Sequence, residues 1–293
     1  MRKVPRHEQG GFLRNNALLI VLLLIIAGVA LVSAGSVVHD TVDEDELAEA
    51  SGLASSLLTP GILYTHNDSG GAPTVYTLNR RGLVPARINL KGVTNRDWED
   101  IAVARDPRTK KPCVYVGDIG DNNARYNSVF VYRFEEIPLE DTLMSVSRID
   151  KYEIVYEDGP RDAEALLVDP RSGDICIISK REEQVGVYLV PYPQSTDKVN
   201  QAKKIATLPY SWVTAADISP NGKYILVKTY TNIYRYKRSG SKTLAQAFAK
   251  KPQTMPYKLE QQGEAVAWDH KGKGYFTLSE RVGSTPAELY YYK

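Results

Sequence analysis

Acidic side chains concentrate in two short stretches of this 293-residue chain. The stretch NRDWEDIA (95–102) contains three acids and a tryptophan, and GDIGDN (117–122) adds Asp118 and Asp121. Both lie beside apolar runs of the kind that form strands, so their carboxylates should be held at strand ends. Carboxylate oxygens without cysteine or clustered histidine are typical ligands of calcium, a hard cation that prefers oxygen.

Glutamate recurs at the start of similar apolar runs along the chain. The four positions are Glu49 in EASGLA, Glu99 in WEDIAV, Glu164 in AEALLV and Glu264 in GEAVAW. A fifth run, AADIS, has Ala216 at the corresponding position and Asp217 beside it. The five positions are 48–65 residues apart. Such spacing indicates a structural repeat, in which Ala216 interrupts the series of acids.

Basic residues and a histidine end the next apolar run of other repeats. His66 ends GILYTH, Lys180 ends ICIISK, and Lys228 lies in YILVKT. An ammonium group beside a calcium ion could hold an anion such as a phosphate ester, and a histidine could act as a base. The catalytic residues, if there are any, are unknown from sequence. His66, Lys180 and Lys228 are the candidates, and each is equally compatible with a surface or packing role.

The repeats predict the fold. Each first run is followed by a turn such as DPRTKK, DPRSGD or SPNGK, and then by further strand-like runs. Four strands in about 40–50 residues are typical of one blade of a β-propeller. We therefore predict an all-β, five-bladed β-propeller over residues 46–293, with six blades as the alternative if residues 138–160 contain a divergent repeat. The last repeat has only three strand-like runs, so residues 35–45 are either a linker or the strand that closes the ring.

In a propeller the first strand of each blade lines the central channel. The predicted channel therefore brings Glu49, Glu99, Glu164 and Glu264 together at one end, and Asp118 and Asp121 approach the same end. Carboxylates held this close either bind protons or are neutralised by a cation. We predict that these six acids bind calcium. The alternatives are glutamates that accept hydrogen bonds from backbone amides between blades, and aspartates that close turns.

The N-terminal region is expected to lie outside the propeller. Residues 1–16 are basic, and residues 17–34 (ALLIVLLLIIAGVALVSA) carry no charge. The apolar run is long enough for a transmembrane anchor, and it also resembles a signal peptide with a small-residue cleavage site. Because basic flanks stay in the cytoplasm, either interpretation predicts an extracytoplasmic body, anchored in the membrane or secreted.

Composition limits the other classes. The net charge is +2, so there is no bulk electrostatic argument for binding nucleic acid. The two cysteines, Cys113 and Cys176, are too few for a disulfide framework or a zinc site. Both lie in apolar runs, which favours buried thiols over a single disulfide.

Six ordered motifs carry a resemblance to a known family. They are HNDSG, NRDWEDIA, YVGDIGDN, RDAEALLVDPRSGD, TAADISPNGKYILVKTYT and QGEAVAW. Over residues 46–293 the chain resembles a family of secreted bacterial β-propeller proteins whose function is largely undefined, and the resemblance implies the fold. In architecture it is also similar to propeller phytases and to five-bladed, calcium-activated apyrases, which bind calcium on the propeller axis. The motifs do not match the apyrases residue by residue, so no catalytic residue is implied.

Two functions follow as expectations. The first is a binding module with an acidic, calcium-binding channel, whose partner is an anionic small molecule or an extracellular protein or glycan. The second is a calcium-dependent hydrolase of phosphoesters. The sequence contains no GxSxG nucleophile motif, which argues against an ordinary serine esterase.

Overall fold

Apolar runs separated by turns fold into antiparallel strands that form five groups. The computed structural model describes residues 37–293 except residue 43, and Val37–Lys293 form one unit. The first group consists of β2 (Ala50–Ser55), β3 (Ile62–Asn67), β4 (Thr74–Asn79) and β5 (Arg87–Leu90). The second consists of β6 (Trp98–Arg105), β7 (Pro112–Asp118), β8 (Val129–Glu135) and β10 (Asp150–Tyr156). The third consists of β11 (Ala163–Val168), β12 (Ile175–Ser179), β13 (Gly186–Val190) and β14 (Asn200–Thr207).

The remaining two groups follow the same order. The fourth consists of β15 (Val213–Ile218), β16 (Tyr224–Thr229), β17 (Ile233–Lys237) and β18 (Gln253–Met255). The fifth consists of β19 (Gly263–Trp268), β20 (Tyr275–Ser279), β21 (Ala287–Tyr292) and β1 (Val37–Val42). A capping box at Thr243 starts the short helix α2 (Leu244–Phe248). The all-β prediction is confirmed, and the strand order is consistent with a β-propeller.

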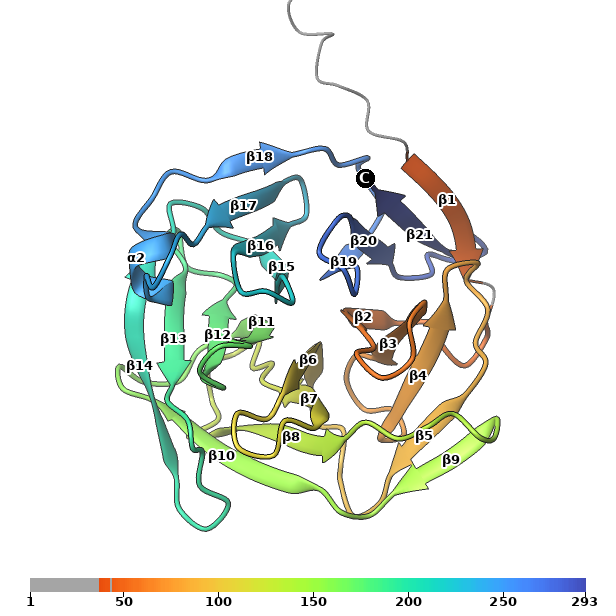
Figure 1. Cartoon of the computed structure of the whole chain (residues 1–293), viewed down its shortest axis with the longest axis horizontal. Coiled ribbons are helices and arrows are strands. Elements are labelled where there is room, and N and C mark those ends of the chain that lie inside the picture. The colour runs from red at the N-terminus through yellow and green to blue at the C-terminus, as the bar shows by residue number, and fades with distance from the viewer. Residues whose placement is uncertain (1–36, 43) are drawn as a thin grey trace, which may run out of the picture. The chain divides into compact units, whose positions relative to one another are not determined.

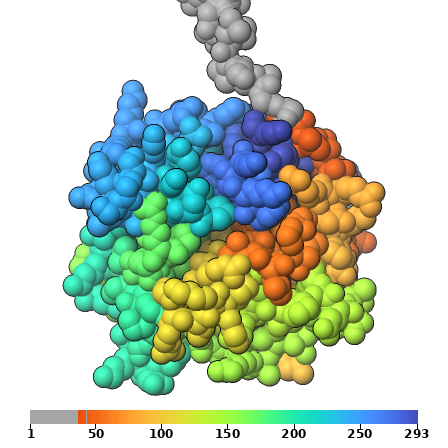
Figure 2. All heavy atoms as spheres, viewed as in Figure 1, coloured from red at the N-terminus to blue at the C-terminus, as the bar shows by residue number. Residues whose placement is uncertain are grey.

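The first strands of the five groups form a closed inner ring (Figure 1). Each of β2, β6, β11, β15 and β19 contacts the next, and β19 contacts β2. Because inner strands are covered on both faces, β11 and β19 consist entirely of buried residues. The outer strand β14 alternates between exposed and covered positions, as a half-solvated strand does. With all atoms drawn, side chains fill the centre of the ring (Figure 2).

The first described strand closes the ring with the last. β1 pairs antiparallel with β21, from Val37 opposite Tyr292 to Val42 opposite Ala287. Gly82, at φ +70°, allows the chain after β4 to approach Thr41 so closely that a Cβ atom would collide with its carbonyl oxygen. Val37–Val42, within the segment 35–45 that was predicted to be a linker or a closing strand, thus supply the outer strand of the fifth group.

Two outer strands join neighbouring groups. β9 (Leu143–Val146) pairs in parallel with β5, and β10 pairs in parallel with β14. The second and third groups therefore share one eight-stranded sheet. Residues 138–160, where a sixth repeat was considered, supply β9 and β10 and form no separate group.

Two further sequence expectations concern the termini and the cysteines. The predicted membrane or signal segment, residues 17–34, lies outside the described residues. Within residues 37–42 and 44–293, no helix is long and apolar enough to cross a membrane. Cys113 and Cys176 are both buried and form no disulfide.

Candidate metal site

Three of the predicted glutamates occupy the same structural position. The pairing of first and second strands skips one residue between Trp98 and Asp100, between Ala163 and Ala165, and between Gly263 and Ala265. The residues skipped in these β-bulges are Glu99, Glu164 and Glu264. A bulge redirects a side chain away from the regular alternation of the strand, so all three glutamates are turned in the same way near the start of their strands.

The predicted equivalents in the other two repeats were wrong. In the fourth group the skip lies between Val213 and Ala215, so Thr214 is the equivalent of Glu99, and Ala216 is an ordinary buried strand residue. In the first group the irregularity lies between Ser51 and Ala54, whereas Glu49 precedes β2 and is exposed. The ring therefore contains three bulge glutamates, and Glu49 is not one of them.

Five carboxylates lie close together at the end of the ring where the inner strands begin. Oxygens of Asp68, Asp97 and Glu99 lie within 4.8 Å of one another, and so do those of Glu99, Asp162 and Glu164. Glu99 belongs to both sets, so we treat the five residues as one acidic cluster. Glu99 and Glu164 are buried, with exposed fractions of 4% and 5%.

Burial and mutual repulsion raise the pKa values of the acidic cluster. Burial and the charges of Asp68 and Asp162 raise the pKa of Asp97 to about 6. Burial, followed by the charge of Glu164, raises the pKa of Glu99 well above its ordinary value. Without a neutralising partner these carboxyl groups would hold protons at a pH at which an exposed acid is ionised.

Two cations contact the acidic cluster. Lys180 donates to the Glu164 carboxylate, and Arg181 donates to Asp162. Burial alone would lower the pKa of Lys180, but the charges of Glu164 and Glu264 outweigh burial and raise it, so the ammonium group stays protonated. Of the three catalytic candidates, Lys180 is therefore the one that reaches the acidic cluster, where it pairs with an acid.

The third bulge glutamate belongs to the surroundings of the acidic cluster. Burial, and then the charges of Glu49 and Glu264, raise the pKa of Asp68, and burial together with the charge of Glu264 raises the pKa of Glu164 to about 8. Burial, and then the charge of Glu264, raises the pKa of Glu280 to about 7. The negative field therefore extends from the second group across to the fifth.

Asp118 and Asp121 have local partners instead. Asp118 accepts from the backbone N–H of Asp97 at 3.1 Å and lies 3.4 Å from the Arg96 guanidinium. Asp121 accepts from the backbone N–H of Tyr126 at 2.7 Å. Neither carboxylate belongs to the two sets of the acidic cluster, but both residues contact it, since Asp118 accepts from Asp97 and the backbone N–H of Asp121 donates to the Asp162 carboxylate at 3.0 Å. The contact of Asp121 with Tyr126 is of the turn-closing kind.

His66 and Lys228 are buried away from solvent, each with an exposed fraction of 0%. The imidazole Nδ1 of His66 lies 2.9 Å from the Asn67 carbonyl, and burial lowers its pKa to about 4. Lys228 donates to the Gly263 carbonyl, and burial lowers its pKa to about 8. Because neither side chain reaches solvent, neither is positioned to act on a substrate at the mouth of the ring.

The six predicted ligands did not include Asp68, Asp97 or Asp162, although the acids of NRDWEDIA, Asp97 among them, were expected to face a metal. A signal was present, because Asp97 and Asp162 each stand two residues before a bulge glutamate, in DWE and DAE. In the fourth and fifth repeats the same position holds Trp212 and Gln262. The acids are therefore doubled in the second and third groups only.

A separate pair of aspartates satisfies backbone groups inside the ring. Asp100, fully buried, accepts from the backbone N–H groups of Ile101, Leu166 and Ala216, which belong to three different inner strands. Asp217 accepts from Ile218 and Trp268, both at 2.7 Å. Glutamates were the candidates for this backbone-linking role in the alternative to a metal site, and these two aspartates perform it.

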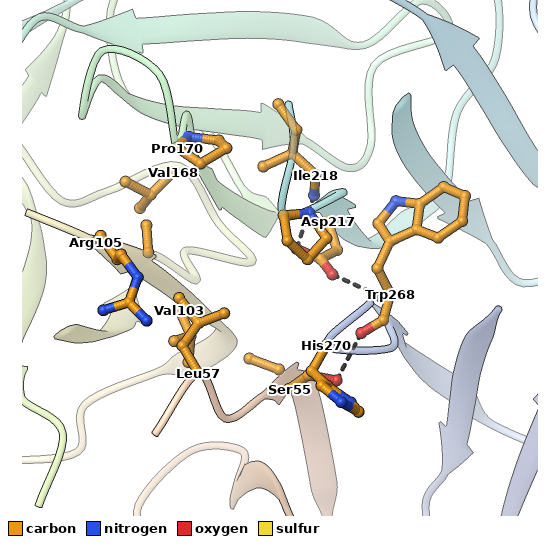
Figure 3. A pocket seen from close by; sticks show the side chains of 13 residues that line it. Ser55, Leu57, Val103, Arg105, Val168, Pro170, Asp217, Ile218, Trp268 and His270 are labelled. Atoms are coloured by element: carbon orange, nitrogen blue, oxygen red, sulfur yellow. Dashed lines mark hydrogen bonds between the residues drawn. The ribbon is translucent and has the colours of Figure 1, made fainter. Parts of the chain in front are cut away.

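The opposite end of the ring contains a cavity of about 160 Å³ (Figure 3). The residues that line this cavity lie at the C-terminal ends of the inner strands, whereas the acidic cluster lies at their N-terminal ends. Asp217 lies at this cavity beside Trp268, and Arg105 and His270 line it. Burial raises the pKa of Asp217 to about 7.

We expect Asp217 to make stability fall as pH rises. Its folded-state pKa of about 7 exceeds the ordinary value of 3.8, so the folded protein retains a proton that the unfolded chain releases. The free energy of unfolding of the wild type, relative to Asp217→Asn, should therefore decrease between pH 4 and pH 7 by on the order of 3 kcal/mol. Urea unfolding of both proteins across this range measures it, and a constant difference would contradict it.

Comparison with known proteins gave no match, either to a family model or to a curated protein. Function must therefore be argued from the site itself.

Proposed function

We propose that the chain is a five-bladed β-propeller whose acidic cluster binds calcium, and that it acts as an extracytoplasmic binding module. The observation that carries the proposal is the acidic cluster, with five carboxylates in two overlapping sets and two basic partners. If all are ionised, five negative charges face two positive ones. A divalent cation would offset most of the remainder.

Two details of the acidic cluster favour a bound ion over protonated acids. The Asp68 Oδ1 atom is buried and has no hydrogen-bond partner, which is costly for a carboxylate oxygen. Gly120 lets the carboxylates of Glu99 and Asp97 lie against its backbone, since a Cβ atom there would collide with both. An ion held by Asp68, Asp97 and Glu99 would satisfy the first, and the glycine lets two of its ligands approach each other.

The donor set favours calcium among the common divalent cations. All five ligand groups are carboxylates, without a cysteine or a histidine, which disfavours zinc and copper. They come from loops and strand ends of three groups, an irregular arrangement that suits the variable coordination of calcium better than the strict octahedron of magnesium. The ion would supply charge neutralisation and link the three groups.

Calcium is expected to raise the thermal midpoint of the protein. A ligand that binds only the folded state stabilises it by about 2.7 kcal/mol at one hundred times its Kd. For a domain of this size that corresponds to roughly 5–10 °C. The measurement is a melting curve in EGTA followed by a calcium titration, with magnesium in parallel.

The variants in this titration separate the acidic cluster from other acids. Glu99→Gln and Gly120→Ala should abolish the shift, the first by removing a ligand and the second because its Cβ atom would displace the carboxylates of Glu99 and Asp97. Asp141→Asn should retain the shift, because Asp141 lies on an exposed loop outside the cluster. An undiminished calcium shift in both Glu99→Gln and Gly120→Ala would refute the site.

A binding module is favoured over a phosphoester hydrolase. Hydrolysis requires a base and an anion-binding cation free at the mouth. His66 and Lys228 are buried, and Lys180 is paired with Glu164. The support for binding is the acidic mouth together with its rim of loops.

The extracytoplasmic location is proposed from the sequence alone. Residues 17–34 are apolar and follow a basic segment, so the body would be exported, either anchored or released. Extracytoplasmic calcium is commonly millimolar, a concentration that suits a site of modest affinity.

A further inference from the structure

A cavity of about 620 Å³ opens between the third and fourth groups, beside the mouth that holds the acidic cluster. Its aromatic lining consists of Tyr210, Trp212, Tyr230 and Tyr234. Its polar lining includes Glu183, Thr231 and Asn232. Apart from Tyr234, which belongs to β17, these residues come from the loops before β13, β15 and β17, so the cavity lies at the same end of the ring as the bulge residues.

The fourth repeat replaces acids with the residues of this cavity. Trp212 stands two residues before the bulge residue Thr214, at the position that Asp97 and Asp162 hold in their repeats. Both acids of the pattern are therefore exchanged, one for tryptophan and one for threonine. The mouth is consequently acidic on the side of the second and third groups and aromatic on the side of the fourth.

Trp212 is held in an exposed position by a backbone conformation that is energetically unfavourable. Its backbone has φ +58°, a left-handed conformation that costs a bulky residue on the order of 1–2 kcal/mol. The backbone N–H of Trp212 donates to the Lys180 carbonyl at 2.6 Å, and this hydrogen bond fixes the backbone conformation. Yet 49% of the residue remains exposed, whereas Trp98 and Trp268 are buried. Packing in the folded chain therefore does not account for a tryptophan here.

The four aromatic rings of the cavity form two pairs, one tilted and one stacked. The Trp212 and Tyr230 rings lie 6.5 Å apart at 43°, and Tyr210 stacks on Tyr234 at 4.4 Å. Both nearby cations are already paired with acids: Arg181 lies 5.5 Å from the Trp212 ring and Lys180 lies 5.3 Å from the Tyr230 ring. The cavity thus offers aromatic faces, neutral polar groups and the Glu183 carboxylate, and no Lys or Arg is among its lining residues.

We propose that this cavity binds a neutral saccharide. A sugar ring has an apolar C–H face, which suits an aromatic wall, and hydroxyl edges, which suit groups such as Glu183, Thr231 and Asn232. A purely apolar ligand would bury those polar groups without partners, at a cost in affinity. The inference rests on the proposed function in that it names the ligand of the binding module, but it uses none of the residues of the acidic cluster.

The test uses the full-length protein, kept in a detergent without a sugar headgroup. The first step is an array of immobilised neutral and acidic oligosaccharides. The best ligand is then titrated while iodide quenching of tryptophan fluorescence is recorded. Because Trp98 and Trp268 are buried, the quenching reports on Trp212. We expect binding to a neutral oligosaccharide, with protection of Trp212 from iodide.

The variants decide whether the aromatic wall makes the contact. Trp212→Ala should weaken binding at least tenfold, and Trp212→Phe should stay within about threefold of the wild type. Tyr126→Ala, which removes another exposed aromatic residue on a different group, should leave the affinity unchanged. If the wild type binds no oligosaccharide better than Trp212→Ala does, the inference is wrong. A Trp212-dependent preference for acidic sugars, or for peptides in a parallel array, would also overturn it.

The calcium measurement separates this inference from the proposed function. Trp212→Ala should keep the calcium-dependent rise in thermal midpoint, because Trp212 is outside the acidic cluster. Saccharide binding without any calcium shift would refute the metal site and leave the cavity assignment standing. A calcium shift without saccharide binding would refute the cavity assignment and leave the metal site standing.

Discussion

Replacing Asp100 by alanine is expected to lower the free energy of unfolding by about 3–5 kcal/mol. The fully buried side chain of Asp100 accepts hydrogen bonds from the backbone N–H groups of Ile101, Leu166 and Ala216, which lie on three inner strands. Alanine leaves all three donors buried without an acceptor, and each unsatisfied group costs roughly 1–3 kcal/mol. Urea unfolding in calcium-free buffer measures the loss and avoids any contribution from the acidic cluster.

Two further variants test the explanation. Asp100→Asn keeps one oxygen that can accept from Leu166 and Ala216, so it should recover part of the loss. Asp141→Ala removes an acid from an exposed loop and should change stability by less than about 0.5 kcal/mol. If Asp100→Ala is as stable as Asp141→Ala, the aspartate does not hold the inner strands together.

Removing β1 is expected to have the largest effect on the fold. Without residues 1–42, β21 becomes an exposed edge, and the buried side chain of Val42 is lost from the core that it shares with Ala287 and Leu289. An unpaired, apolar edge strand also invites aggregation. We expect the thermal midpoint to fall by at least about 10 °C, with self-association at micromolar concentration.

The matched comparison is the chain without residues 1–36, which retains β1. Melting curves and light scattering on both proteins give the result. Equal midpoints and equal monomer content would show that the ring does not depend on closure by β1. A difference confined to the shorter protein would show that Val37–Val42 is the required segment.

Much of the strand order could be predicted from sequence because it depends on local signals. Apolar runs and turns such as DPRSGD mark the strands, and the three-stranded last repeat pointed to a closing strand at residues 35–45. Register is different, because it depends on which residue a bulge leaves unpaired. In the fourth and first repeats the bulges involve Thr214 and the residues between Ser51 and Ala54, none of which is acidic. Aligning the repeats by residue type therefore chose Ala216 and Glu49 as the equivalents of Glu99.

The candidate site was predicted in part for the same reason. Glu99 and Glu164 were found because the bulge glutamates recur in similar runs. Asp68 and Asp162 were absent from the predicted set, and Asp97 was expected only as one of the acids of NRDWEDIA, because the nearness of the three depends on how loops of three groups approach each other. His66 and Lys228 show the opposite limit: polar residues at the ends of strands look accessible in sequence, yet burial by neighbouring strands removes them from the mouth.

The pairing of β1 with β21 also has a consequence for biosynthesis. Val42 and its partner Ala287 are separated by more than 240 residues, so β1 leaves the ribosome long before its partner exists. At about 5–20 residues per second, this strand waits on the order of 10–50 s without its partner. Its exposed residues Val37 and Val38 are then available to chaperones or to other nascent chains. Ring closure is therefore a late event in synthesis, and the yield of folded protein should depend on what shields that strand in the interval.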